Sequence, residues 1–129
     1  MAVRTKDAAA EIAASWWADK VVRPTFDAGA DSPAMMMAEV MATIGAAKIE
    51  ESAKDKFKNI LKQKILNEFN RTNYQIGIHC DYHPEGILDE AITEADIPSS
   101  NVPWKTSMWI DPDGTVSVKY GYGRGVVDL

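Results

Sequence analysis

The sequence has little cysteine and histidine, the residues that supply sulfur and nitrogen for nucleophilic catalysis and metal binding. Its 129 residues include one cysteine and two histidines, so an internal disulfide bond is impossible and nitrogen or sulfur ligands for a metal are scarce. The net charge of −5 argues against broad contact with nucleic acid, which needs a basic surface. No apolar run approaches the roughly 20 residues that span a bilayer, and residues 1–10 lack the apolar core of a signal peptide. We therefore expect a cytoplasmic protein that does not bind membranes.

The composition and length are typical of one globular domain. Apolar residues make up 46% of the chain and charged residues 26%, both close to the average for soluble proteins. Two cores within this length would each bury too little surface to be stable. Apolar residues recur at helical spacing in residues 1–72 and with a period of two in much of residues 73–129. We expect a single domain, residues 1–129, with a helical part and a sheet part.

Three helices are expected in the helical part. The first has an apolar stripe that includes Ala9, Ala13 and Trp16, and ends before Pro24, because proline disfavours the α conformation in the residue before it. The second, residues 35–49, is apolar almost all round, which is typical of a helix buried on most sides. The third, about Glu50 to Asn70, is amphipathic and has one apolar side.

The sheet part reads as three strands and one short helix. Residues 75–82 alternate apolar and polar side chains, and two further alternating segments flank a turn at Asp111–Gly114, which predicts a hairpin. Residues 84–97, which begin with Pro84, predict the short helix. Because a sheet needs a second layer on one face, the fold class is α+β. A three-helix N-terminal layer packs on a three-stranded antiparallel sheet, with the short helix between the first and second strands.

The segment HCDYH concentrates possible metal ligands in five residues. If His79, Asp81 and His83 lie on one face of a strand, the outer two Cα atoms are about 13 Å apart, too far for both histidines to reach one ion easily. Cys80 then points to the opposite face and cannot exchange a proton with the histidines. Two readings remain: a small metal-dependent hydrolase that uses His79 and Asp81, or the solvated face of a strand. Ligand number and geometry favour the second, so we predict no metal, no cofactor and no catalytic residue.

A binding surface is the more credible site. If Met108 and Ile110 face the helices, Trp109 faces away from them, near two lysines on the same face. A large aromatic beside cations offers contact area and anion affinity together. The glycine-rich segment GYGRG adds a tyrosine and an arginine, although it also fits a strand that leaves the sheet at a kink. The predicted binding residues are Lys105, Trp109, Lys119, Tyr122 and Arg124.

Several segments together resemble small uncharacterised proteins encoded in bacteriophage and prophage genomes. These are the Trp16-Trp17 pair, the short Asp/Gly loop before a methionine- and alanine-rich segment, DYHPEGIL, and VPWKTSMWIDPDGTVSVKYGYG. The resemblance implies an accessory phage protein that acts in the cytoplasm of a bacterial host. Such a protein binds and neutralises a host component, for example a CRISPR nuclease or a signalling nucleotide of a defence system. The resemblance supplies no catalytic residue.

Two classes of partner are therefore expected for a non-enzymatic binding protein: a host bacterial protein, or a small anionic signalling nucleotide that the chain sequesters. The metal-dependent hydrolase ranks below both, because no convergent catalytic set is visible. The apolar circumference of residues 35–49 and the Trp16-Trp17 pair further predict a homo-oligomer, most simply a two-fold dimer formed through the N-terminal helices.

Overall fold

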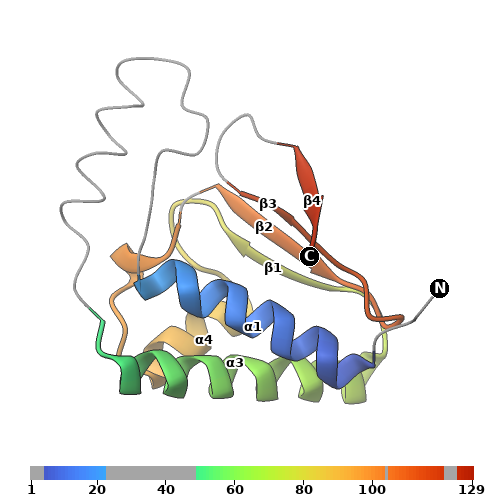
Figure 1. Ribbon diagram of the computed structural model, residues 1–129, viewed down its shortest axis with the longest axis horizontal. Helices are drawn as coiled ribbons and strands as arrows, with labels where there is room; N and C mark the ends of the chain where they lie inside the picture. The colour runs from blue at the N-terminus through green and yellow to red at the C-terminus, as the bar shows by residue number, and fades with distance from the viewer. Residues whose placement is uncertain (1–4, 23–48, 104, 121–124) are drawn as a thin grey trace.

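The computed structural model describes residues 5–22, 49–103, 105–120 and 125–129 (Figure 1). The helix expected over residues 35–49 falls, except for Ile49, outside these residues. The described helices are α1 (Lys6–Val22), α3 (Glu51–Thr72), α4 (Gly86–Glu94) and the 3-10 turn η1 (Ser99–Asn101). The strands are β1 (Ile76–Cys80), β2 (Thr106–Ile110), β3 (Val116–Lys119) and β4 (Val126–Asp128). The α+β class and the short helix between β1 and β2 are as predicted.

Hydrogen bonds and a left-handed residue define the ends of the two long helices. The hydroxyl of Thr5 accepts a hydrogen bond from the backbone N–H of Ala8 at 3.0 Å, which satisfies one free donor in the first turn of α1. At the other end of α1, the buried Asn101 donates its side-chain N–H to the carbonyl of Val21 at 2.8 Å. Helix α3 ends at Asn73, which adopts the left-handed conformation (φ 56°) that commonly terminates helices.

The buried side of α1 consists mainly of alanines, so α3 can approach it closely (Figure 1). Trp17 is fully buried on this side, whereas Trp16 is only partly buried and meets Trp17 edge-on, with 5.0 Å between ring centroids. Of the expected stripe, Ala9 and Ala13 are buried as predicted, but the fully buried tryptophan is Trp17 and not Trp16. The reason is that alanine pairs four residues apart set the buried face, which comprises Ala9, Ala10, Ala13, Ala14, Trp17, Ala18 and Val21.

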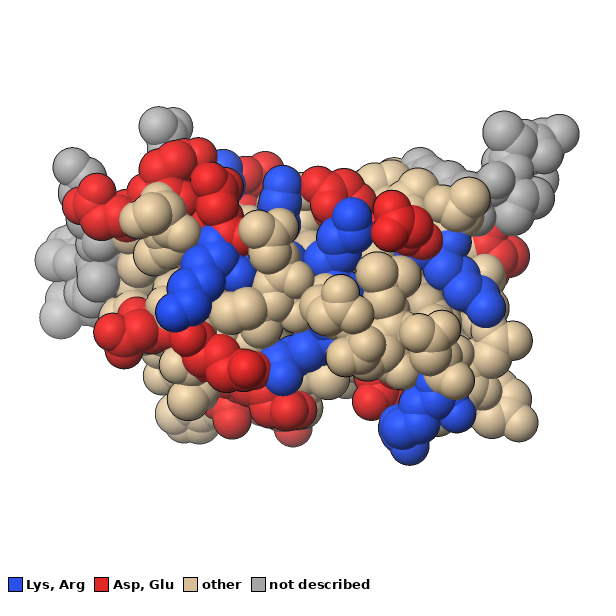
Figure 2. Space-filling model, turned by 90° about the horizontal axis from the view of Figure 1, so that it is seen from below, with Lys and Arg blue, Asp and Glu red and all other residues tan. Residues whose placement is uncertain are grey.

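Ion pairs run along the seam between α1 and α3 and from α3 to α4. In Figure 2, which views the helical side of the molecule, lysines lie next to acids rather than in a patch of one sign. Each pair is partly exposed and contributes little to stability. Along the seam, residue numbers rise on α3 as they fall on α1, which fits an antiparallel arrangement of the two helices. The ion pairs are Lys54–Asp19, Lys58–Glu11, Lys62–Glu11 and Lys62–Asp7 between α1 and α3, and Lys64–Glu90 and Lys64–Glu94 between α3 and α4.

The sheet is antiparallel in the order β1-β2-β3-β4, so it has four strands where three were predicted. The additional strand is β4, whose Val126 pairs with Lys119 and whose Asp128 pairs with Ser117 of β3. The hairpin between β2 and β3 turns at Asp111–Gly114, as expected. Because β4 has three residues, all exposed, it shows no apolar alternation by which the sequence could reveal it.

The two faces of the sheet have different surroundings. α1 contacts β2 and β3, while α3 and α4 contact β1, all on one side (Figure 1). We call this side the inner face; it carries the buried residues Ile76, Ile78, Cys80, Thr106, Met108, Ile110, Val116 and Val118, and also Val127. The opposite side, the outer face, carries Gly77, His79, Ser107, Trp109, Ser117, Lys119, Val126 and Asp128.

None of the described helices is both long enough and apolar enough to cross a bilayer.

Candidate binding face and its pocket

The outer face carries two cross-strand rows of residues. Strand alternation places both rows on the side away from the helices, because neighbouring side chains in a strand point to opposite faces. Met108 and Ile110 are fully buried and Trp109 between them is half-buried, so the predicted orientation of Trp109 is confirmed. The rows are His79, Ser107 and Lys119, and Gly77, Trp109, Ser117 and Asp128.

His79 is held in place by three contacts on this face. Its Nδ1 and the hydroxyl of Ser107 share a hydrogen bond of 2.9 Å. Its ring meets that of Trp109 near edge-on, with centroids 6.1 Å apart. The ring also lies above Gly77, since a Cβ built on that glycine would come within 2.5 Å of Nε2. The missing side chain of Gly77 thus makes room for the imidazole.

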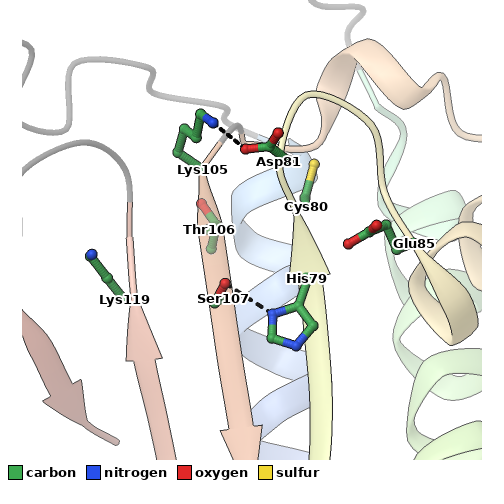
Figure 3. Close-up of a pocket in the computed structure, with 8 residues that line it drawn as sticks. All are labelled: His79, Cys80, Asp81, Glu85, Lys105, Thr106, Ser107 and Lys119. Atoms are coloured by element: carbon green, nitrogen blue, oxygen red, sulfur yellow. Dashed lines mark hydrogen bonds and ion pairs between the residues drawn. The ribbon is translucent and has the colours of Figure 1, made fainter.

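A pocket of about 420 Å³ opens at the end of the sheet where β1 leaves it (Figure 3). Two of the predicted binding residues, Lys105 and Lys119, line this pocket, whereas Trp109 lies beside it against His79. The lining residues are His79, Cys80, Asp81, Glu85, Lys105, Thr106, Ser107 and Lys119.

Lys105 is already engaged by Asp81. Its backbone N–H donates to the carbonyl of Asp81 at 2.7 Å, and its ammonium forms an ion pair with the carboxylate of the same residue. The ammonium also lies over the ring of Tyr82, 4.5 Å from its centroid. Hydrogen bonding to Asp81 raises the pKa of Lys105. These contacts hold Lys105 in the left-handed region (φ 52°), which residues with a side chain seldom adopt.

Lys119 differs from Lys105 in having no ion pair within the described residues. It projects from β3 and is exposed, and in Figure 3 no dashed line reaches its ammonium. Glu85, also exposed, lies on the opposite side of the pocket, beyond β1. The pocket therefore has cationic and acidic sides, with the His79–Ser107 hydrogen bond between them.

The expectation that His79, Asp81 and His83 share one strand face was wrong. β1 ends at Cys80, and the chain turns back so that Pro84 forms a bridge with Cys80. The backbone N–H of Glu85 donates to the carbonyl of His79 at 3.1 Å. Asp81 and His83 consequently lie in an exposed turn and not on the strand. The ladder with β2 ends at the pair Cys80 and Thr106, because the next residue of the partner strand, Lys105, has a left-handed backbone that does not continue a strand.

Cys80 points into the core, as strand alternation predicts. It is 1% exposed, and burial raises the pKa of its thiol to about 12. A thiol with this pKa is protonated at neutral pH and is a poor nucleophile. Over the part of the chain that the structure describes, no three His, Cys, Asp or Glu side chains come together in a group able to hold a metal ion.

Two of the five predicted binding residues, Tyr122 and Arg124, fall outside the described residues. Sequence reasoning overlooked two others that shape the site, Gly77 and Glu85. A glycine within an alternating strand signals a close approach by another group, so the role of Gly77 was open to detection. The position of Glu85 depends on the turn after β1, for which no local pattern gives a signal.

Comparison with known proteins finds no matching family model and no matching curated protein.

Proposed function

We propose that this chain is a non-enzymatic binding protein whose outer sheet face docks on a protein partner. The observation that carries the proposal is the half-buried Trp109, which no described element covers and which lies beside His79 and near Lys119. A tryptophan in such a position favours a partner that completes its burial, since tryptophans at the centre of interfaces contribute much of the binding energy.

The resemblance to small bacteriophage proteins suggests the kind of partner. We propose a bacterial defence protein in the cytoplasm of a phage host, such as a CRISPR nuclease, which the chain inhibits by occupying its surface. Lys119, exposed and without an ion pair in the described residues, favours an acidic side chain of the partner near Trp109. An aromatic anchor with an adjacent cation supplies both affinity and orientation.

The contacts of His79 weigh against catalysis. One ring nitrogen is engaged with Ser107, and the other lies above Gly77 instead of against a carboxylate. Activation of a serine by a histidine needs a third group that orients the base. The carboxylate of Asp81, which the metal-dependent alternative requires, is paired with Lys105.

The second candidate, sequestration of a small anionic nucleotide, rests on the pocket between Lys105 and Lys119. Its volume of about 420 Å³ is suitable for a small ligand. However, Asp81 neutralises Lys105, and Glu85 also lines the pocket. Two acids beside two cations disfavour a ligand that carries several negative charges, so the protein partner ranks first.

Affinity capture from bacterial lysate tests the proposal. The bait proteins are wild type, Trp109→Ala, Lys119→Glu and a matched control, Lys56→Glu, whose exposed side chain lies on α3. Trp109→Ala should weaken binding by about 1–3 kcal/mol, as for a contact residue. We expect proteins that wild type and Lys56→Glu retain equally and that the two outer-face variants lose. Equal capture by all four baits contradicts the proposal, and a small anion extracted with wild type alone supports the second candidate.

A further inference from the structure

The fourth strand presents apolar side chains to solvent. Val126 is 57% and Val127 58% exposed, whereas Val116 and Val118 of the neighbouring strand are buried. β4 is also the last strand of the sheet, so its outer edge has no neighbour among the described strands. A strand edge with exposed apolar residues and no covering element favours pairing with another strand.

The hydrogen bonds between β3 and β4 identify which backbone groups are available. The N–H of Leu129 donates to the carbonyl of Val116 at 2.9 Å, in line with the register that pairs Asp128 with Ser117. In an antiparallel ladder the backbone groups of successive residues point to alternate sides. Val127 therefore bonds toward β3, and the N–H and C=O groups of Val126 and Asp128 point to the outer edge.

This edge is complementary to itself. A two-fold axis at Val127 places Val126 opposite the partner's Asp128 and Asp128 opposite the partner's Val126. Each of these pairs can exchange two backbone hydrogen bonds, because all the groups involved point outward. An isologous contact requires this reciprocity, in which one residue meets a second and the second meets the first.

The charges on the outer face also fit a second copy. Asp128 lies opposite the partner's Val126 and not opposite another carboxylate. Like charges are therefore not brought together between the two β4 strands. Lys119 neighbours Val126 within its own sheet, in the row that continues to the partner's Asp128. The carboxylate of Asp128, which already accepts a hydrogen bond from the hydroxyl of Ser117 at 2.9 Å, then lies in the row of Lys119, and the ammonium stays available to another partner.

On the inner face, the pairing covers a groove between α1 and β4. The groove has a volume of about 430 Å³, and Val127, Leu129, Trp16 and Tyr120 contribute to its walls. Trp16 and Tyr120 meet edge-on with 5.7 Å between ring centroids. Each Val127 then covers its symmetry mate and joins the two grooves, whose walls also include Lys20 with its ammonium over the rings of Trp16 and Tyr120.

We propose that two copies of this chain associate through β4, so that their sheets become one continuous antiparallel sheet. This interface differs from the helix-mediated dimer expected from the sequence, although α1 still contributes Trp16. The outer faces of both copies then lie on one side of a single extended surface.

Disulfide trapping tests the register directly. Across the axis, the two Val127 residues form a non-hydrogen-bonded pair with Cα atoms about 4.5 Å apart, within the range of a disulfide bond. The two Val126 residues are offset from each other by two positions along the strands. Their Cα atoms are therefore roughly 8 to 9 Å apart, which is too far for a disulfide bond. Mild oxidation of full-length Val127→Cys should give a covalent dimer, and the matched control Val126→Cys should not. The buried Cys80 adds little background, since burial raises its thiol pKa to about 12.

Sedimentation of the unmodified chain provides the second measurement. Wild type should sediment as a dimer at micromolar concentration, and Val127→Lys as a folded monomer, because a lysine on a strand edge opposes pairing. Equal cross-linking of the two cysteine variants, no cross-linking of Val127→Cys, or a wild-type chain that remains monomeric would overturn the proposal.

Discussion

Met108 and Trp109 are neighbours on β2, yet they belong to different environments. Met108 is fully buried beneath the helices, and Trp109 is half-buried on the face that no described element covers. The inner face is almost entirely apolar, whereas the outer face combines an aromatic ring, an imidazole, hydroxyls and a lysine. The inner face therefore supplies the core that stabilises the fold. The contacts on the outer face contribute less to the stability of the fold, so its side chains are available for binding.

The largest expected effect comes from the inner face. Met108→Ala removes a fully buried side chain and should lower the free energy of unfolding by about 2–5 kcal/mol, through lost burial and the cavity that remains. Denaturant titration by circular dichroism measures this loss. A loss below about 1 kcal/mol would mean that the two faces do not differ as described.

A smaller effect is expected from Gly77→Ala on the outer face. The added Cβ would lie within 2.5 Å of Nε2 of His79, so the ring must move and its hydrogen bond with Ser107 is lost. We expect about 0.5–1.5 kcal/mol of destabilisation, typical of one hydrogen bond, and a changed NMR signal of the His79 imidazole. Gly125→Ala is the matched control, because nothing lies within 4 Å of its Cβ position. An unchanged His79 signal in Gly77→Ala would refute the packing of the ring on the glycine.

The smallest effect concerns the helical layer. Hydrogen bonds from Lys58 and Lys62 lower the pKa of Glu11 below 4.5. A carboxylate whose pKa is lowered in the folded state stabilises it above the unfolded pKa, and this stabilisation is lost as the pH falls through the folded pKa. Because the side chain of Glu11 is 42% exposed, solvent screening keeps the effect of Glu11→Gln below about 1 kcal/mol. Thermal melts should show a difference from wild type at pH 7 that shrinks as the pH falls below 4.5.

The parts of the fold that follow local patterns could be predicted from the sequence. The amphipathic period of α3, the alternation of β1 and the turn at Asp111–Gly114 each depend on nearby residues, and each was located, although β1 ends at Cys80 and not at residue 82. β4 could not be predicted, because its three exposed residues show no alternation and form a strand only through hydrogen bonds with β3. The sequence also did not show which tryptophan of α1 is buried. Two helical stripes are equally regular, one through Trp16 and one through the alanines and Trp17, and the second is the buried one.

The candidate site was predicted only in part, for the same physical reason. Strand alternation was enough to place Trp109 and Lys119 on one face. The ion pair of Lys105 with Asp81 joins residues far apart in sequence, and it depends on how the chain turns after Cys80. Contacts set by such turns require the folded chain.

The most direct test of the account compares binding and folding for a single variant, Trp109→Ala. In one preparation, its thermal melt and its capture of the proteins that wild type retains are both measured. The account predicts a stability loss of about 1 kcal/mol, much smaller than for Met108→Ala, because the ring is only half-buried. It predicts a loss of binding of about 1–3 kcal/mol. A collapse of the folding transition, or capture equal to that of wild type, would contradict the assignment of the outer face to binding.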